Sequence, residues 1–475
     1  MRRTKIVATL GPATDNPAVM ERLLKAGTNM VRINFSHGAD MAQTRIAAVR
    51  ECAKKIGVTV GIMGDLQGPK IRISRFQKGK VLLEKGAQFI LDASLPVTAG
   101  TDVSVGIDYK QLPEDVAPED TLLLDDGRIV LTVKKIEGPR VICIVKVGGE
   151  LSNNKGINRL GGGLTAAALT EKDKEDLLVA VAANVDYIAV SFPRDANDIQ
   201  IARDLLTAAG SDAGIIAKIE RAEAVVNIDE IISASDAIMV ARGDLAVEIG
   251  DAEVPGAQKH MIRRARALDR PVITATQMME SMIHSSVPTR AEVSDVANAV
   301  LDQSDAVMLS AETAVGDHPD KVVETMARIC IAAEKQPETQ VSGHRMELQF
   351  KRTDEAIAMA TLYTANHLDI KAILTLTESG STPLMMSRLR TNIPIYALTR
   401  NAATLGKMTL YRDVFPILFD STQSEAEKVT ATAIATLKDL GLIATGERII
   451  FTKGDHMGVH GGTNTMKIIQ VNEVS

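Results

Sequence analysis

The chain has 475 residues, of which 45% are hydrophobic and 24% are charged. This length exceeds what one core supports and predicts roughly two to four domains in a soluble globular protein. The net charge of −6 excludes a general nucleic-acid-binding protein, because phosphate contacts need a basic surface. The widely spaced cysteines match no metal-binding pattern, and no apolar run reaches membrane-spanning length.

The start of the chain bears on the expected location of the protein. Basic residues precede the apolar run Ile6–Leu10, an order that also occurs in secretory signal peptides. This run is short, however, and it ends in Gly11-Pro12 without a small-residue cleavage pattern. We therefore interpret it as a first strand, and we expect a cytoplasmic protein that binds neither membranes nor nucleic acids.

Short runs rich in Val and Ile recur up to Ser310, and helical patterns follow most of them. Such runs are typical of buried parallel strands. Eight strand–helix units predict a (β/α)8 TIM barrel, whose active site lies at the C-terminal ends of the strands. The predicted strands are Lys5–Leu10, Met30–Phe35, Thr59–Asp65, Tyr187–Phe192, Ile215–Glu220, Ala237–Ala241, Pro271–Thr276 and Ala306–Ser310.

This strand–helix rhythm breaks between the third and fourth runs. Residues 69–169 carry alternating apolar patches separated by turn sequences such as Asp126-Gly127. The pattern predicts a small antiparallel β-barrel domain inserted into a loop of the TIM barrel. An insertion there lies over the mouth of the barrel, where it can act as a lid. The catalytic barrel is then discontinuous, over residues 1–68 and 170–336.

A separate C-terminal α/β domain is expected over residues 337–475, with a regulatory function. Its strands and helices alternate as in the barrel but do not continue it. We expect a helix over Thr353–His367 and strands over Lys371–Thr377, Ile395–Thr399, Val414–Phe419, Arg448–Thr452 and Met466–Val471.

Polar and charged side chains occur together at the predicted strand ends. Arg32, Asn34 and Ser36 alternate with apolar residues in the second strand, so all three are expected on one face. Lys218 and Glu220 share a face of the fifth strand in the same way. This pattern suits an anion near Arg32 and a transferring phosphoryl group near Lys218.

Two carboxylates are expected to meet at this rim. Glu220 ends the fifth strand, and Asp244 follows the sixth, its neighbour in the barrel. Together they can bind one Mg²⁺ ion. The structural alternatives are an internal Lys218–Glu220 ion pair and a turn at Asp244. Further polar groups at the same rim, Asp65, Thr276 and Ser310, favour the functional interpretation.

These segments together resemble the pyruvate kinase family. They occur in the family's order, with the inserted domain in the family's place, and they span essentially the whole chain. The resemblance is strongest to the bacterial second-type enzymes. The matching segments are Thr4–Pro12, Val31–Gly38, Asp65–Arg72, Ala217–Glu220, Met239–Leu245, Ala275–Met282 and Met308–Ala314.

The resemblance implies a phosphotransferase of glycolysis that converts phosphoenolpyruvate and ADP into pyruvate and ATP. Glu220 and Asp244 would bind Mg²⁺, and Lys218 would stabilise the transferring phosphoryl group, which Arg32 would also contact. Such a reaction needs positioning and charge neutralisation and no protein nucleophile. The resemblance also implies a homotetramer.

The remaining substrate contacts are likewise implied by the resemblance. The amides of Gly243 and Asp244, together with Thr276, would hold the substrate carboxylate. Asn34, His37 and Arg72 would lie toward the nucleotide. Relatives carry a Lys after the Phe-x-Arg of the fourth strand, whereas Asp195 stands there in this chain. That nucleotide contact is therefore not transferred to Arg194.

A monovalent-cation pocket is also implied. Many pyruvate kinases bind K⁺ with side chains that match Asn34, Ser36 and Asp65 and with the carbonyl that matches Leu66. Those enzymes have Glu where this chain has Lys70. An ammonium group there can supply the charge of K⁺ and repel a second cation. We therefore expect little or no K⁺ dependence, unless the flexible Lys70 side chain extends into solvent.

A turn rich in Ser and Thr over residues 375–382 predicts an effector site. It lies between a strand and a helix, where hydroxyls and free amides suit an anion; the structural alternative is a helix cap. The resemblance implies a sugar-phosphate or nucleotide-monophosphate activator, with residues 454–465 nearby. The predicted effector residues are Thr377, Ser379, Gly380, Ser381 and Thr382.

Two other functions fit parts of the pattern. A Mg²⁺-dependent lyase or aldolase acting on an enol-pyruvate would also use strand-end Glu and Asp residues. A non-catalytic regulatory paralogue is the second alternative. The lid and the pair of Arg32 and Lys218 favour phosphoryl transfer over a lyase or aldolase. The presence of these two residues together with Glu220 and Asp244 argues against a non-catalytic paralogue.

Overall fold

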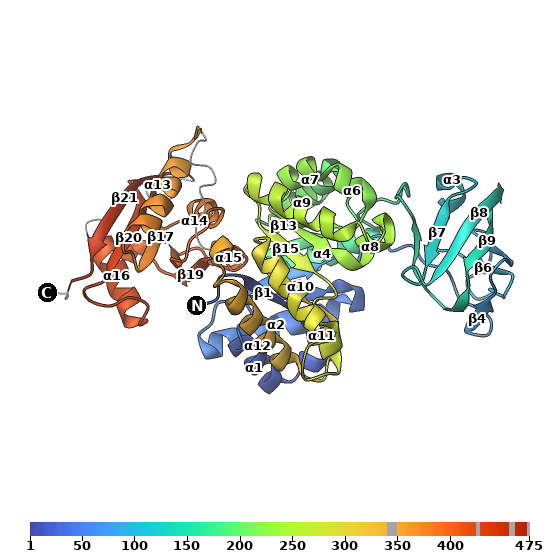
Figure 1. Cartoon of the computed structure of the whole chain (residues 1–475), viewed down its shortest axis with the longest axis horizontal. Helices are drawn as coiled ribbons and strands as arrows, with labels where there is room; N and C mark the ends of the chain where they lie inside the picture. The colour runs from blue at the N-terminus through green and yellow to red at the C-terminus, as the bar shows by residue number, and fades with distance from the viewer. Residues whose placement is uncertain (340–348, 424–427, 456–460, 473–475) are drawn as a thin grey trace.

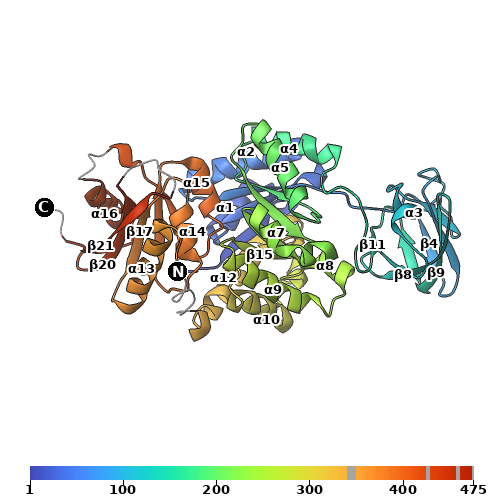
Figure 2. The ribbon, with the colours of Figure 1, turned by 90° about the horizontal axis from the view of Figure 1, so that it is seen from above.

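The computed structural model describes residues 1–339, 349–423, 428–455 and 461–472. The chain forms three parts in a row: a central barrel, an inserted domain at one end and a C-terminal domain at the other (Figure 1). Seen from above, thin connections join the inserted domain to the barrel (Figure 2). No helix among the described residues combines the length and apolar character needed to cross a bilayer.

The central part is a closed barrel of eight parallel strands, as predicted. Each predicted run forms one strand of it, with ends that differ by at most two residues. In spatial order the strands are β1 (Lys5–Thr9), β16 (Ala306–Leu309), β15 (Val272–Ala275), β14 (Ala237–Ala241), β13 (Gly214–Ile219), β12 (Tyr187–Val190), β3 (Gly61–Asp65) and β2 (Met30–Asn34).

Helices surround this barrel because its strands are apolar on both faces. In β1, Ile6 and Ala8 pack against the helices, whereas Val7 belongs to the barrel interior. The helices are α1 (Pro17–Lys25), α2 (Ala39–Ile56), α4 (Glu171–Ala182), α5 (Ala196–Ala208), α6 (Ala222–Val226), α7 (Ile228–Ala234), α8 (Arg242–Ile249), α9 (Val254–Ala267), α10 (Arg290–Leu301), α11 (Ala311–Ala314) and α12 (Pro319–Ala333), with short 3-10 turns η1 (Pro12–Thr14), η2 (Phe35–His37), η3 (Glu280–Ile283) and η4 (Pro337–Thr339).

The inserted part consists of two sheets, one of six strands and one of two, where a single small antiparallel β-barrel was expected. Its one parallel pair, β5 with β6, also departs from the expected pattern. Alternating patches in the sequence predict five of its strands, over Lys80–Leu83, Gln88–Leu91, Thr121–Leu124, Ile129–Val133 and Val141–Val147, but they do not predict the short β6, β10 and β11. Its elements are β4 (Lys80–Leu83), β5 (Gln88–Asp92), β6 (Ser104–Gly106), α3 (Leu112–Asp115), β7 (Thr121–Leu124), β8 (Ile129–Glu137), β9 (Arg140–Val147), β10 (Gly149–Ser152) and β11 (Ile157–Arg159).

The C-terminal part is a five-stranded sheet in the order β19-β18-β17-β20-β21, parallel except for β21. The expected helix and the five expected strands are all present. The elements are α13 (Thr353–His367), β17 (Ala372–Leu376), α14 (Ser381–Ser387), β18 (Ile395–Thr399), α15 (Ala402–Met408), β19 (Val414–Leu418), η5 (Ser421–Gln423), α16 (Val429–Asp439), β20 (Arg448–Gly454) and β21 (Thr463–Gln470).

The C-terminal domain seals the N-terminal end of the barrel. Arg388 is fully buried and forms an ion pair with the buried carboxylate of Asp305, at the start of β16. Helix α15 approaches the start of β12 so closely that a Cβ atom added at Gly406 would collide with Asp186 Oδ1. Asp186 cannot withdraw freely, since its other oxygen accepts a hydrogen bond from the Ile62 amide at 2.7 Å. The glycine therefore sets how closely the two domains dock.

We predict that Gly406→Ala lowers the free energy of unfolding by about 1–3 kcal/mol, the usual cost of overpacking. Thermal or urea unfolding measures this loss. Gly256→Ala is the matched control, because that helical glycine faces open space and the change should be neutral or slightly stabilising. Equal stability of the two variants would contradict the close approach.

Candidate active site

Four charged side chains meet at the C-terminal mouth of the barrel. Asp65, at the end of β3, accepts a hydrogen bond from Arg32 Nε at 2.5 Å. Its other oxygen lies 3.3 Å from Lys218 Nζ, and Glu220 Oε1 lies 3.0 Å from the same ammonium. The two carboxylates are almost completely buried, with side-chain exposures of 1% and 2%. Buried charges of this kind persist because each has an opposite partner.

The electrostatics of this cluster follow from burial and pairing. Burial would raise the pKa of Asp65, but Arg32 and Lys218 hold that pKa below its usual value. Burial would lower the pKa of Lys218, but Asp65 and Glu220 raise it above its usual value, so the ammonium stays charged. Burial raises the pKa of Glu220 to about 7, although Lys218 opposes the change and Asp244 adds to it.

Asp244 is the second carboxylate expected to bind a metal, and it lies in the first turn of α8. Its Oδ1 atom lies 3.2 Å from Lys70 Nζ, so the structure already places one cation against it. Glu220 and Asp244 follow the neighbouring strands β13 and β14, and the negative charge of Asp244 adds to the raised pKa of Glu220. Glu220 and Asp244 thus offer carboxylate oxygens, the ligands that a hard divalent cation prefers. Lys70 holds one of the two, Asp244.

The predicted carboxylate subsite depends on a strained turn after β15. Thr276 and Gln277 both have positive φ angles, +67° and +54°, which are unfavourable for residues other than glycine. Arg242 holds this turn by donating to the carbonyls of Ala275 and Thr276 at 3.3 and 2.7 Å. The Thr276 hydroxyl thereby accepts a hydrogen bond from the Gly243 amide at 2.9 Å. The same hydroxyl donates to the Ala275 carbonyl at 2.6 Å, so amide, hydroxyl and carbonyl form one hydrogen-bonded chain.

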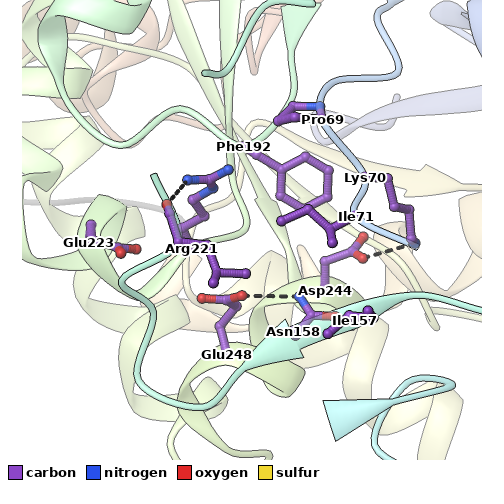
Figure 3. A pocket seen from close by; sticks show the side chains of 11 residues that line it. Pro69, Lys70, Ile71, Ile157, Asn158, Phe192, Arg221, Glu223, Asp244 and Glu248 are labelled. Atoms are coloured by element: carbon purple, nitrogen blue, oxygen red, sulfur yellow. Dashed lines mark hydrogen bonds and ion pairs between the residues drawn. The ribbon is translucent and has the colours of Figure 1, made fainter. Parts of the chain in front are cut away.

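A cleft separates this rim from the inserted domain (Figure 3). Lys70 and Asp244 face each other at one side of the cleft, and Phe192 lies at its centre beside Ile71. On the far side, the Arg221 guanidinium donates to the Leu164 carbonyl at 2.9 Å. The connections of the inserted domain therefore form part of the wall of the site.

Comparison with known proteins gives the family. The model of the pyruvate kinase barrel domain matches residues 1–323, and that of the pyruvate kinase alpha/beta domain matches residues 355–469. The chain belongs to the pyruvate kinase family. Members of this family are phosphotransferases that convert phosphoenolpyruvate and ADP into pyruvate and ATP.

Individual relatives match this chain along nearly its whole length. Pyruvate kinase II of Salmonella typhimurium is 56% identical over 478 residues and 99% of each chain. A pyruvate kinase of Haemophilus influenzae is 55% identical over 459 residues and 96% of each chain. The crystal structure of a pyruvate kinase from Cryptosporidium parvum is similar with a TM-score of 0.92 at 34% identity, covering 99% of this chain and 96% of that one. The resemblance seen in the sequence is confirmed.

One expectation about the second strand is wrong. Strand β2 ends at Asn34, whose side-chain oxygen accepts the Ser36 amide at 3.0 Å and starts the 3-10 turn η2. Ser36 therefore lies outside the strand and is exposed, so it does not continue the face of Arg32 and Asn34. Of His37 the structure describes the backbone in η2 and not the side chain.

Two other residues predicted at the pyruvate kinase site have partners of their own. The Leu66 carbonyl, expected in the K⁺ pocket, accepts a hydrogen bond from Ser191 Oγ at 2.7 Å. Arg72 belongs to the connection of the inserted domain, where its guanidinium donates to the Asn154 carbonyl at 3.0 Å. Sequence patterns missed Ser191 altogether, because no alternation or motif marks the end of β12.

A cavity in the C-terminal domain collects most of the predicted effector residues. Thr377, Ser379, Ser381 and Thr382 line it, whereas Gly380 provides the left-handed turn at the start of α14 without lining it. Arg400 and Lys453 contribute positive charge, and Glu378 and Asp455 contribute negative charge. Gly454, Gly461, Gly462 and Thr463 of the predicted late loop also line the cavity, while residues 456–460 lie outside the described residues.

Proposed function

We propose that the cluster of Arg32, Asp65, Lys218 and Glu220 carries out the phosphoryl transfer of the family in this chain. The observation that supports this most directly is the Lys218 ammonium. Its side chain is 11% exposed, stays charged, and is held between two carboxylates at the mouth of the barrel. A preorganised charge of this kind stabilises negative charge that develops in a transition state.

The proposed reaction needs no covalent enzyme intermediate. The amides of Gly243 and Asp244, together with the Thr276 hydroxyl, would hold the substrate carboxylate. The Gly243 amide would exchange its bond to Thr276 for one to the substrate, and this places the phosphoryl group toward Arg32 and Lys218. The bond between phosphorus and the enol oxygen breaks as the terminal oxygen of ADP bonds to phosphorus. The enolate that remains then takes a proton at carbon. Thr276, Ser310 and a held water are alternative donors; among the described residues, Ser310 Oγ is buried without a hydrogen-bond partner.

Family membership favours this function over a lyase or aldolase on the same fold. The geometry adds a separate argument, because Arg32 and Lys218 both converge on the mouth of the barrel through Asp65. Two cations on one side of a site suit a phosphoryl group better than an uncharged aldol acceptor. A non-catalytic paralogue would not need the cluster of Arg32, Asp65, Lys218 and Glu220, and all four side chains are present in this chain.

We predict that Lys218→Met lowers kcat by at least about 100-fold, the typical cost of losing one preorganised charge. Purified-protein turnover of phosphoenolpyruvate with ADP and Mg²⁺ measures the effect, and circular dichroism checks the fold. Lys174→Met serves as the control, since that partly exposed lysine pairs with Glu171 on the outer helix α4. Turnover near the wild-type rate in Lys218→Met would contradict the assigned role.

Glu220 and Asp244 are the proposed Mg²⁺ ligands, and the bound ion would neutralise charge on the substrate oxygens. Among the described residues, no group of three or more His, Cys, Asp or Glu side chains gathers as a metal site. Two protein carboxylates suit the way Mg²⁺ is often bound, by one or two carboxylates with substrate and water completing the shell.

Replacing either ligand should raise the Mg²⁺ concentration needed for half-maximal activity. We predict a shift of at least about 10-fold for Glu220→Ala and for Asp244→Ala. Glu248→Gln is the matched control, because this carboxylate lines the same cleft but pairs with Asn158 at 3.0 Å. A Mg²⁺ titration that coincides with the wild type in both alanine variants would rule out these ligands.

We further propose that Lys70 takes the place of K⁺ in this chain. The side chain of Lys70 is 32% exposed and its ammonium pairs with Asp244 instead of extending into solvent. A positive charge is thereby supplied beside the metal ligands, where a second monovalent cation would meet repulsion at short range.

The expected result is activity that needs Mg²⁺ but changes less than about twofold when K⁺ replaces tetramethylammonium. Lys70→Glu should create K⁺ dependence, because a carboxylate there attracts a cation. Lys155→Glu is the control, since its partner Asp125 lies within the inserted domain. Activation of the wild type by K⁺ by about an order of magnitude would show that the Lys70 ammonium does not take the place of K⁺.

The C-terminal cavity is the proposed site of a phosphorylated activator. Hydroxyls of Thr377, Ser379 and Ser381 face it together with Arg400 and Lys453, a combination that suits a phosphate and the hydroxyls of a sugar. Among the sugar phosphates and nucleoside monophosphates, the chemistry of the lining does not select one. A homotetramer in the cytoplasm remains the proposed assembly and location, and light scattering tests the assembly.

For the activator site, we predict that Ser379→Asp abolishes the response to every activating sugar phosphate or nucleoside monophosphate while basal turnover persists. The physical reason is repulsion between the new carboxylate and the phosphate. Thr445→Asp adds the same charge to the exposed surface of this domain outside the cavity, and it should leave activation intact. An unaltered response in Ser379→Asp would place the activator elsewhere.

A further inference from the structure

Three strand ends interlock around Ser191, the residue that follows β12. Its side chain is completely buried. Its hydroxyl accepts a hydrogen bond from Lys218 Nζ at 2.6 Å and donates one to the Leu66 carbonyl at 2.7 Å. Of the three groups around the ammonium, Ser191 lies closer than Glu220 at 3.0 Å and Asp65 at 3.3 Å. A neutral hydroxyl therefore lies closer to the Lys218 ammonium than either carboxylate does.

The next residue holds the neighbouring carboxylate. The Phe192 amide donates to Glu220 Oε2 at 2.9 Å. To do so Phe192 adopts a φ angle of +56°, a conformation that bulky side chains rarely take. Strained backbone of this kind persists only where its surroundings fix it. The dipeptide Ser191-Phe192 thus contacts both Lys218 and Glu220, one through a side chain and one through the backbone.

The loop after β3 is shaped to receive this dipeptide. A Cβ atom added at Gly68 would lie 2.7 Å from Ser191 Cβ and 3.0 Å from the Phe192 ring. Gly68 itself has a φ angle of +69°, and its amide donates to the buried Asp173 at 3.0 Å. The position of the Ser191 hydroxyl is therefore set by packing on one side and by the Leu66 carbonyl on the other.

We propose that Ser191 is a positioning residue for phosphoryl transfer, which directs the Lys218 ammonium toward the transferring group. The proposal rests on the proposed role of Lys218. Asp65 and Glu220 attract the ammonium by charge, an interaction with little preference for direction. The hydroxyl accepts along one direction because its own proton is committed to Leu66. It thereby fixes the direction of one N–H group of Lys218, while the other two point toward Asp65 and Glu220, where oxygens of the substrate phosphoryl group would compete with these carboxylates for them.

The test is steady-state kinetics of Ser191→Ala in the full-length enzyme. Loss of a hydrogen bond to a charged group predicts a fall in kcat of about 10- to 100-fold. The KM for phosphoenolpyruvate and the Mg²⁺ requirement should each change by less than about threefold, because neither depends on the direction of the ammonium. Ser191→Thr keeps the hydroxyl and should recover part of kcat. Ser191→Cys preserves the size and provides the same measurement if the alanine variant is unstable.

The matched control is Ser304→Ala. Ser304 is also completely buried, and its hydroxyl bonds Thr274 Oγ1 at 2.7 Å, but it precedes β16 at the opposite end of the barrel. Its loss should leave kcat within about twofold of wild type. An equal fall in kcat for both variants, or a fall in Ser191→Ala that accompanies a raised KM, would show a general structural effect and overturn the proposal.

A double-mutant comparison separates this proposal from the function on which it rests. In a Lys218→Met background, Ser191→Ala should have no further effect on residual turnover, because the group it positions is gone. Additive losses would overturn the positioning role while leaving the role of Lys218 intact. Full activity of Lys218→Met alone would instead refute the proposed function. A kcat of Ser191→Ala within twofold of wild type would overturn the positioning role directly.

Discussion

A buried carboxylate organises the mouth of this barrel. Asp65 is almost inaccessible to water, and it meets Arg32 on one oxygen and Lys218 on the other. Two like charges could not be held so close in a nonpolar surrounding without a negative charge between them. Asp65, at the end of β3, therefore holds both cations near one point, while Ser191 and the Phe192 amide fix the directions of Lys218 and Glu220. The chemistry of the site is thus built on a charge that does not itself need to touch the substrate.

The two ends of the barrel have different tasks. The C-terminal mouth carries polar groups under the inserted domain, while the N-terminal end is sealed by the C-terminal domain through Arg388, Asp305 and α15. Interior residues such as Val7 and Met30 share one apolar cluster with residues of the C-terminal sheet, among them Ile373. The barrel interior and the C-terminal sheet are therefore joined by continuous apolar packing.

Much of this arrangement could be predicted from the sequence, because parallel strands buried on both faces leave long apolar runs and a two-residue period marks Lys218 and Glu220. Other features have no such signature. Ser36 does not lie on the expected face of β2, because its amide donates a hydrogen bond to the Asn34 side chain and the strand ends at Asn34. The pairing of Lys70 with Asp244 depends on how the inserted domain enters the barrel. Ser191 acts from the end of a strand whose pattern is purely apolar, and the short strands β6, β10 and β11 offer too few residues for a periodic pattern.

The order of the strands along the chain has a consequence for synthesis on the ribosome. Strand β1 pairs with β16, and β3 pairs with β12 across the whole inserted domain. Such long-range pairing is slow to form, and unpaired strand edges are prone to aggregate. All strands of the inserted sheets are translated before β12. These sheets can therefore fold while β1, β2 and β3 still lack the other five strands of the barrel. A nascent chain of this kind exposes two open sheet edges until Ala306–Leu309 has left the exit tunnel, and during that interval it is a natural client for a chaperone.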